Sequence, residues 1–187
     1  MKKLLLIDNY DSFTYNLKHC LQIAGANVQV VFSDDPQLRV IAQEAQAIII
    51  SPGPSKPSKS FEVKSLIKSL YTNRPVLGIC LGMQIINENF GGTTGKAPFP
   101  VHGKIAEISI LRESRLFNGL PDSFKSARYH SLVCKSISRE FVLTASYNTV
   151  PMAIEHRSLP VYGVQFHPES FLSKYGQRIL TNFVNLV

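Results

Sequence analysis

The chain has 187 residues, enough for one domain spanning 1–187, and its 44% hydrophobic and 18% charged residues exclude a disordered polypeptide. No apolar run approaches the roughly 18–20 residues of a membrane span, and Asp8 interrupts the opening apolar run too early for a signal peptide, so a cytoplasmic protein is expected. The net charge of +7 makes a nucleic-acid or acidic partner worth considering, although no helix-turn-helix or zinc-finger spacing is present.

Strands and helices are predicted to alternate in the first half of the chain. Asp11 and Ser12 provide oxygen atoms that can cap one helix, and Asp35 and Pro36 indicate the N-cap and first turn of another. The expected elements are strands at 3–8, 28–32, 47–51 and 75–79, and helices at 13–24, 35–46 and 61–71. This alternation predicts an α/β fold, with a mostly parallel, flavodoxin-like central sheet covered by helices on both faces.

The second half of the chain, after residue 92, contains short runs suited to antiparallel pairing. These runs lie at 105–110, 141–146 and 152–156. The apolar segment at 161–166 returns to the pattern of a buried strand, and 175–187 predicts an amphipathic helix that ends the chain. Antiparallel strands are therefore expected in the second half of the fold.

Of the three cysteines, only one has a sequence context that indicates reactivity. Cys20 lies within an amphipathic helix pattern and Cys134 within a Val-Cys-Lys run, so both are predicted to be structural. The chain has no Cys-x-x-Cys pair, so the sequence predicts neither a disulfide framework nor a zinc site. Cys80 instead lies between a predicted strand and a predicted helix.

Cys80 stands in the motif Gly-x-Cys-x-Gly, which has the layout of a nucleophile elbow. Gly78 and Gly82 would let neighbouring backbone approach a sharp turn without a Cβ clash. The Cys80 sulfur would then lie at a helix N-terminus, whose free N–H groups favour a thiolate, and the N–H of Leu81 would point at a substrate carbonyl. The segment fits a buried structural cysteine between packing glycines equally well.

A thiolate nucleophile needs a base, and the chain has five histidines. Two are predicted to be surface or structural residues (His19, His156), two lie in irregular segments (His102, His130), and the fifth is His167. Pro168 ends the strand before His167, so this imidazole is expected at the carboxyl edge of the sheet, as Cys80 is. Glu169 could hydrogen-bond the far ring nitrogen, as the acid of a triad does. A turn histidine and a helix-start acid would explain the same two residues.

The segment 51–54, Ser-Pro-Gly-Pro, ends the third predicted strand at the same edge of the sheet. Its prolines stiffen the backbone, and Gly53 lets a ligand approach an exposed N–H group closely. This N–H group could be a second donor to an oxyanion, with an ordinary Pro-Gly turn as the alternative.

Six motifs, in this order, resemble those of the class I (triad-type) glutamine amidotransferases. They are LIDNYDSFT at 6–14, SPGP at 51–54, GICLGMQ at 78–84, HGK at 102–104, RYHSL at 128–132 and GVQFHPES at 163–170. The resemblance spans nearly the whole chain. The opening motif is most similar to the small subunits of anthranilate synthase and 4-amino-4-deoxychorismate synthase. The segment SKPSKS at 55–60 departs from the family pattern, which continues with Gly-x-Pro in many members.

The resemblance implies roles for the residues that match these motifs. Cys80, His167 and Glu169 would form the catalytic triad, and the N–H groups of Gly53 and Leu81 would form the oxyanion hole. The residues implied to bind glutamine are Pro52, Gly53, Pro54, Leu81, Gln84, Ser131 and Leu132. The segment 102–104 would lie near the interface with a synthase. No metal and no organic cofactor is implied.

The function that the resemblance implies is hydrolysis of L-glutamine to glutamate and ammonia. The family pattern accounts for all 187 residues, so the ammonia is expected to pass to a separate chorismate-binding synthase subunit, in a heterodimer or larger hetero-oligomer. The product would be anthranilate, 4-amino-4-deoxychorismate or both, because this chain sees only glutamine and the synthase selects the product.

Two other classes of function remain open. A non-catalytic flavodoxin-like binding module explains the alternating first half but leaves the contexts of Cys80, His167 and Glu169 as coincidence. A basic nucleic-acid-binding protein explains the net charge but leaves the elbow unexplained. The densest group of basic residues has no interleaved aromatic residues, which favours a solvated face and no nucleic-acid partner. This group consists of Lys56, Lys59, Lys64 and Lys68.

Overall fold

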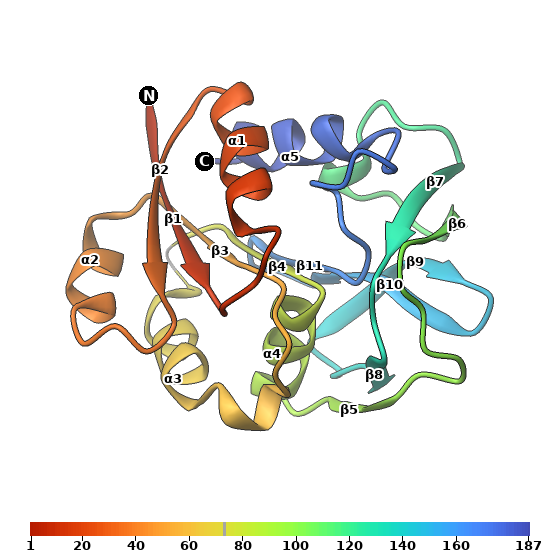
Figure 1. The fold of residues 1–187 in the computed structure, drawn as a ribbon, viewed down its shortest axis with the longest axis horizontal. Helices are drawn as coiled ribbons and strands as arrows, with labels where there is room; N and C mark the ends of the chain where they lie inside the picture. Colours follow the sequence, from red (N-terminus) through yellow and green to blue (C-terminus); the bar gives the residue numbers. More distant parts are fainter. Residues whose placement is uncertain (73) are drawn as a thin grey trace.

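The computed structural model describes residues 1–72 and 74–187 (Figure 1). Its strands are β1 (Lys2–Asp8), β2 (Ala26–Phe32), β3 (Ala47–Ile50), β4 (Val76–Ile79), β5 (Thr93–Lys96), β6 (Lys104–Ile110), β7 (Ser123–Arg128), β8 (Leu132–Ser136), β9 (Phe141–Tyr147), β10 (Val150–His156) and β11 (Val161–Val164). Its helices are α1 (Thr14–Ile23), α2 (Leu38–Glu44), α3 (Phe61–Leu70), α4 (Leu81–Asn89) and α5 (Gly176–Asn185), with short 3₁₀ helices η1 (Pro57–Lys59) and η2 (Arg115–Phe117). Among the helices of these residues, none is long and apolar enough to cross a membrane.

A mixed sheet crosses the molecule, and its strand order confirms the predicted fold class. In the described part of the chain, nine strands follow the order β2-β1-β3-β4-β11-β10-β9-β6-β7. β2, β1, β3, β4 and β11 are parallel, in the order of a flavodoxin-like sheet with β11 in the fifth place. β10, β9, β6 and β7 continue the sheet in antiparallel pairs. The fold is therefore α/β, with a parallel centre and antiparallel strands from the second half.

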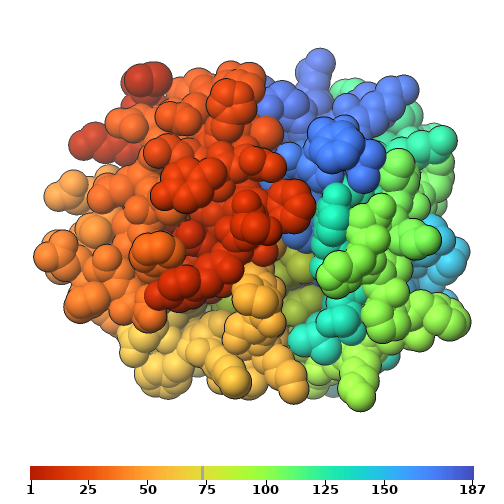
Figure 2. All heavy atoms as spheres, in the orientation of Figure 1, coloured from red at the N-terminus to blue at the C-terminus, as the bar shows by residue number. Residues whose placement is uncertain are grey.

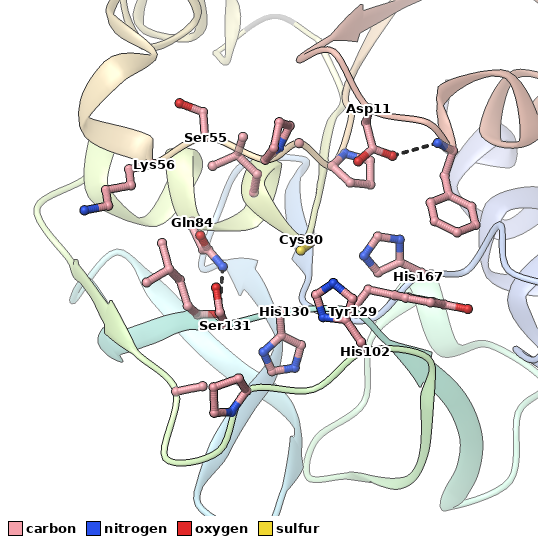
Figure 3. Close-up of a pocket in the computed structure, with 18 of the residues that line it drawn as sticks. Asp11, Ser55, Lys56, Cys80, Gln84, His102, Tyr129, His130, Ser131 and His167 are labelled. Carbon is pink, nitrogen blue, oxygen red and sulfur yellow. Dashed lines mark hydrogen bonds between the residues drawn. The ribbon is translucent and has the colours of Figure 1, made fainter.

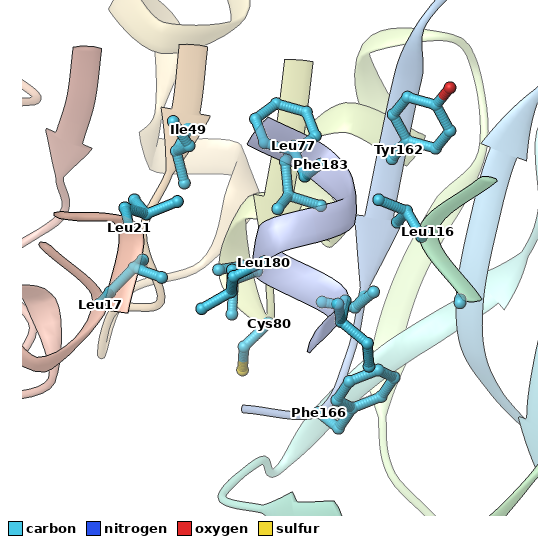
Figure 4. Packing of buried hydrophobic residues seen from close by; sticks show 14 of the residues in the cluster. Leu17, Leu21, Ile49, Leu77, Cys80, Leu116, Tyr162, Phe166, Leu180 and Phe183 are labelled. Carbon is cyan, nitrogen blue, oxygen red and sulfur yellow. The ribbon is translucent and has the colours of Figure 1, made fainter. Parts of the chain in front are cut away.

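Alternate side chains of the parallel strands enter opposite layers, which explains why helices cover both faces of the sheet. Leu4 and Leu6 of β1 pack in the layer that contains α1 and α5, whereas Leu5 and Ile7 pack in the layer that contains α2, α3 and α4. Figure 4 shows part of the first layer, in which α5 and its Leu180 lie across the parallel strands. Strands buried on both faces are apolar throughout, so they are recognisable as continuous apolar runs.

The carboxyl ends of β1, β3, β4 and β11 meet at one edge of the sheet, where the strand order reverses between β1 and β3. This position is the usual place of a ligand site in a doubly wound sheet. Hydrogen bonds tie the first two loops together, because the Asn9 N–H donates to Ser51 Oγ (2.9 Å) and Asn9 Nδ2 donates to the Ser51 carbonyl oxygen (3.0 Å). Thr14 Oγ1 donates to Asp8 Oδ1 (2.7 Å) and holds α1 against them. The opening motif thus builds the edge on which the other motifs lie.

An aspartate precedes each of two helices, and one of these helices begins later than predicted. Asp35 Oδ1 accepts a hydrogen bond from the Gln37 N–H (2.7 Å) and so caps a turn over residues 36–37, and α2 begins only after this turn, three residues later than predicted. Asp11 Oδ1 likewise accepts from the Phe13 N–H (2.9 Å), directly before α1. The turn after Asp35 therefore delays α2, whereas the predicted start of α1 is correct to one residue.

Three strands were not predicted, and the predicted strand at 161–166 ends two residues early in the structure. β5 and β8 form a separate two-stranded antiparallel sheet, and β7 pairs with β6. β11 ends at Val164 rather than at residue 166, because the chain beyond it crosses towards β7, where the His167 N–H donates to the Ala127 carbonyl oxygen (3.0 Å). This crossing brings His167 to the edge of the sheet where Cys80 lies.

Candidate active site

A cavity of about 950 Å³ opens at this edge of the sheet. It lies on the face drawn in Figure 2, where the red and orange N-terminal segments meet the green and teal segments of the second half. Nine of the residues singled out in the sequence line it: Pro52, Gly53, Pro54, Cys80, Leu81, Gln84, Ser131, Leu132 and His167. Glu169 is buried and contacts His167 from outside the lining. The structure therefore brings all the predicted site residues together.

Cys80 occupies a strained turn between β4 and α4, as the elbow interpretation predicts. Its φ of 53° and ψ of −102° form a conformation that L residues rarely adopt. Its N–H donates to the Val164 carbonyl oxygen (2.7 Å). A Cβ atom on Gly78 would lie 2.4 Å from the backbone of Gly82, and one on Gly82 would lie 2.4 Å from the Ile50 carbonyl oxygen. Both glycines are required for this turn, whereas a cysteine that only fills space needs no such strain.

The other two cysteines occupy packing positions, as predicted. Cys134 is buried, and burial raises the pKa of its thiol to about 12. Cys20 is half-buried on α1, and burial also raises its pKa. Neither thiol lines the cavity. Cys80, by contrast, directs its sulfur into the cavity (Figure 3).

Glu169 folds back onto His167, and its Oε1 lies 2.6 Å from His167 Nδ1. A carboxylate only accepts hydrogen bonds, so Nδ1 carries the shared proton. Burial acts to lower the pKa of His167, but the Cys80 sulfur and the Glu169 carboxylate outweigh it and raise that pKa well above its ordinary value. His167 Nε2 has no hydrogen-bond partner among the described residues, and the imidazole lies beside Cys80 (Figure 3). Nε2 is therefore free to exchange a proton with a group at the sulfur.

Phe13 and Tyr129 enclose the imidazole of His167. Their ring centroids lie 5.7 and 5.0 Å from that of His167, both in edge-to-face geometry. Tyr129 is held in turn by a contact of 3.3 Å between its hydroxyl and Ser170 Oγ. The sequence predicted no role for Phe13 or Tyr129. Their position inside the motifs at 6–14 and 128–132 was the only indication that they belong to the site.

His130 also lines the cavity, in an electrostatic state opposite to that of His167. It is 3% exposed, and neither ring nitrogen has a hydrogen-bond partner among the described residues. Burial, together with the positive charges of Arg128 and His167, lowers the pKa of His130 to about 4. The His130 imidazole is therefore neutral near pH 7.

The remaining histidines take no part in the centre of the cavity. His102 is exposed at its rim, and His19 is exposed on α1. His156 is buried, and its Nδ1 accepts hydrogen bonds from the N–H groups of Ser158 (3.2 Å) and Leu159 (3.1 Å). The predicted surface or structural character of His19 and His156 is confirmed.

Gln84 and Leu132, both predicted to bind glutamine, contact each other. Gln84 Nε2 donates to the Leu132 carbonyl oxygen (3.0 Å) and to Gln165 Oε1 (3.0 Å). Both hydrogens of this amide are therefore used inside the protein, and Oε1 is the Gln84 atom that remains for a ligand. Ser131 is exposed directly before β8, and its carbonyl oxygen accepts from the Ala97 N–H (2.8 Å).

The loop at 51–54 is more than an ordinary turn. A Cβ atom on Gly53 would lie 2.7 Å from Asn9 Cβ and 2.9 Å from Leu81 Cδ2, so glycine is required where this loop, the opening motif and α4 meet. Leu81 is the first residue of α4, and the first N–H groups of a helix have no intrahelical partner. Ser55 and Lys56, in the segment that departs from the family pattern, line the cavity mouth.

A cysteine at a strained strand-to-helix turn, beside a buried histidine–carboxylate pair, is typical of cysteine-dependent hydrolases with an α/β fold. The family model for class I glutamine amidotransferases matches residues 5–186. The chain therefore belongs to the class I glutamine amidotransferase family.

Individual relatives agree with this assignment. The chain is 42% identical to anthranilate synthase component 2 of Methanothermobacter marburgensis over 99% of both chains. It is also 42% identical to anthranilate synthase component 2 of Azospirillum brasilense, covering 97% of this chain and 95% of the relative. A crystal structure from Thermoplasma acidophilum, described as that of a GMP synthase protein, matches with a TM-score of 0.91 and 27% identity. That match covers all of this chain and 94% of the other.

The state of His130 predicts how stability depends on pH. The folded protein holds this imidazole neutral with a pKa of about 4, whereas the unfolded chain protonates it near pH 6.5, so the unfolded state binds more protons between these values. The contribution of His130 is therefore complete above about pH 6.5 and lost as the pH falls to about 4, amounting to about 3 kcal/mol at most.

Urea unfolding of the parent and of His130→Asn across this pH range measures the effect. We expect the parent to lose stability more steeply on acidification than the variant, and His19→Asn, at an exposed site, to follow the parent. Parallel curves for the parent and His130→Asn would mean that His130 is not held neutral.

Proposed function

We propose that this chain hydrolyses L-glutamine through a triad of Cys80, His167 and Glu169, within a single domain of residues 1–187, and delivers the ammonia to a separate chorismate-using synthase subunit. The observation that carries the proposal is the strained turn of Cys80 beside the His167–Glu169 pair in one cavity. Membership of the class I glutamine amidotransferase family indicates glutamine as the substrate.

In the first half of the proposed reaction, the Cys80 thiolate attacks the side-chain carboxamide carbon of glutamine. The carbonyl oxygen becomes an oxyanion, and we assign the N–H groups of Gly53 and Leu81 as its donors. Leu81 begins α4, so the helix dipole adds to its effect. His167 Nε2 then gives its proton to the departing nitrogen, the carbon–nitrogen bond breaks, and ammonia leaves a thioester on Cys80.

In the second half, water hydrolyses the thioester. His167 Nε2 removes a proton from the water as its oxygen attacks the thioester carbon, and the bond to sulfur then breaks to restore the thiolate and release glutamate. Glu169, through its contact of 2.6 Å, keeps the ring oriented and stabilises the imidazolium that forms in each half.

We assign the amino-acid end of glutamine to the part of the cavity that Gln84 lines. Gln84 Oε1 is the free acceptor of a buried amide, which suits the α-ammonium group. Pro52, Pro54, Ser131 and Leu132 line the cavity around the rest of the substrate.

The relatives support the identity of the partner. They are named anthranilate synthase component 2, so we propose that the partner is the other component of anthranilate synthase and that the product is anthranilate. His102 lies at the cavity rim, and the segment 102–104 is exposed there, so a partner that docks on this segment would cover the cavity mouth. Production of 4-amino-4-deoxychorismate with the corresponding synthase is the alternative that the test below separates.

A non-catalytic flavodoxin-like module is the competing interpretation of the fold. It explains the parallel sheet and the position of the cavity. It gives no reason for a cysteine at φ 53°, or for a buried carboxylate 2.6 Å from a buried histidine. The site geometry therefore favours the enzyme.

Replacing Cys80 by alanine tests the nucleophile. In complex with the synthase subunit, we expect Cys80→Ala to lose glutamine-dependent synthesis and to keep ammonia-dependent synthesis, because the synthase can use added ammonia directly. Cys20→Ala, at a cysteine outside the cavity, serves as the control and should keep both activities. Glutamine hydrolysis by Cys80→Ala at the parental rate would assign the nucleophile to another group.

His167 and Glu169 differ in role and should differ in the cost of their removal. His167→Ala removes proton transfer, which is worth about 10²- to 10⁴-fold in kcat. Glu169→Gln keeps a polar partner and loses orientation and charge stabilisation, so its kcat should fall less. Steady-state glutaminase assays of the complexes measure both, with the exposed His19→Ala as control. An active His167→Ala variant would move the base to His130.

The isolated chain is expected to be a poor glutaminase that a docked synthase activates, because ammonia made without an acceptor is lost to protonation in bulk water. We expect the large subunit of anthranilate synthase to raise kcat, with and without chorismate, more strongly at low salt than at high salt, because the chain carries a charge of +7. Titration with each of the two large subunits tests this. Activation by only the large subunit of 4-amino-4-deoxychorismate synthase would reassign the product, and full activity of the isolated chain would indicate a free-standing amidase.

A further inference from the structure

Gln165 is a buried amide for which the proposed reaction has no use. It lies directly after β11 and two residues before His167, and it is fully buried. Its Nε2 lies 3.4 Å from Cys80 Sγ, and its Oε1 lies 3.0 Å from Gln84 Nε2. A buried polar side chain in contact with the reacting sulfur calls for a physical explanation.

One backbone carbonyl determines the direction of two amides. The Leu132 carbonyl oxygen only accepts hydrogen bonds, so the Gln84 atom 3.0 Å from it is the donor Nε2. The other hydrogen of Nε2 faces Gln165, so the atom that Gln165 presents there is the acceptor Oε1. The remaining group of this amide, Nε2, then faces the Cys80 sulfur. The contacts are consistent with one arrangement, in which an N–H points at Cys80.

We propose that Gln165 is a positioning residue for Cys80, whose amide N–H donates a hydrogen bond to the sulfur and holds it as a thiolate in the cavity. This inference rests on the proposed role of Cys80 as the nucleophile. An N–H donates more strongly to an ionised sulfur than to a neutral thiol, so the contact favours the thiolate. The sulfur then lies between His167 and a donor that does not itself titrate.

The same contacts join the sulfur to the glutamine-binding end of the cavity. Leu132 and Gln84 lie at that end, and the orientation of Gln165 depends on both of them. Gln84 should therefore influence Cys80 without touching it. The sulfur loses its charge when it forms the thioester, so the hydrogen bond from Gln165 should then weaken. It should strengthen again when hydrolysis restores the thiolate.

Alkylation of Cys80 by iodoacetamide as a function of pH tests the inference in the full-length chain, with the Cys80 peptide quantified by mass spectrometry. Gln165→Met removes the donor at similar length, and we expect it to slow alkylation at pH 7 about tenfold and to move the profile to higher pH. Gln165→Glu, which is isosteric, should move the profile in the same direction and remains informative if the methionine variant folds poorly. The rate at high pH should be unchanged, because the thiolate is then fully formed.

A second comparison tests the route through Gln84. Gln84→Met frees the Gln165 amide to turn, so it should move the profile in the same direction by a smaller amount. In the double variant Gln84→Met/Gln165→Met, we expect the profile of Gln165→Met alone, because Gln84 then has no donor to orient. Additive shifts would contradict this route.

The control is another buried amide, Asn87 on α4, which bonds the Ser136 carbonyl oxygen and the Ser138 N–H away from the sulfur. Asn87→Leu should lower stability and leave the alkylation profile in place. The titratable groups that face the sulfur or its cavity are the same in every variant except Gln165→Glu. They are His167, Asp11, Lys56, Lys96, His102, Tyr129, His130 and Cys134.

The outcomes separate this inference from the proposed function. An alkylation profile unchanged in Gln165→Met and Gln165→Glu would overturn the role of Gln165, even if kcat falls, because a purely structural residue would act that way. Alkylation reports on the sulfur without glutamine, so the Gln165 contact is measured whether or not Cys80 is the nucleophile. The nucleophile is tested separately by the loss of glutamine-dependent synthesis in Cys80→Ala.

Discussion

The close approach of α4 to β3 is the constraint on which the site depends. Gly82 passes so near the Ile50 carbonyl oxygen, and Gly78 so near Gly82, that neither position has room for a side chain. This approach lets the chain reverse from β4 into α4 and hold Cys80 at a φ of 53°, a conformation that costs about 1–3 kcal/mol. β4 lies between β3 and β11, in the covered middle of the sheet, so packing on both faces maintains the strain.

Both halves of the sheet contribute residues to the site. The parallel strands bring Ser51 and Cys80 to one edge, but His167 arrives there because the chain leaves β11 and pairs with Ala127 of β7. The opposite wall of the cavity also comes from the second half of the chain, where the Val101 N–H donates to the His130 carbonyl oxygen (3.1 Å). The cavity is thus held by backbone hydrogen bonds on both sides, which suits a site whose atoms must be placed accurately.

The parts of this fold that the sequence predicted are those with a local physical signal. Continuous apolar runs predicted the parallel strands because both faces of these strands are buried. Gly-x-Cys-x-Gly predicted the elbow because the sharp turn leaves no room for a Cβ atom at either glycine. β5 and β8 pair through backbone with little apolar alternation, so they left no pattern to find. Asp35 gave a misleading helix start because a turn over residues 36–37 separates it from α2. Gln165 was missed because a polar residue within an apolar run shows its purpose only when its distant partners, Gln84 and Cys80, are known.

The aromatic walls around His167 also restrict how its ring can move. Phe13 and Tyr129 lie against the imidazole, and Glu169 holds Nδ1, so a half-turn of the ring about its Cβ–Cγ bond would have to push both aromatic side chains aside and break the 2.6 Å contact. In the proposed reaction one nitrogen gives a proton to ammonia and then takes one from water. A ring that cannot turn over performs both transfers with the same atom, so no time is lost in each cycle to restoring its orientation.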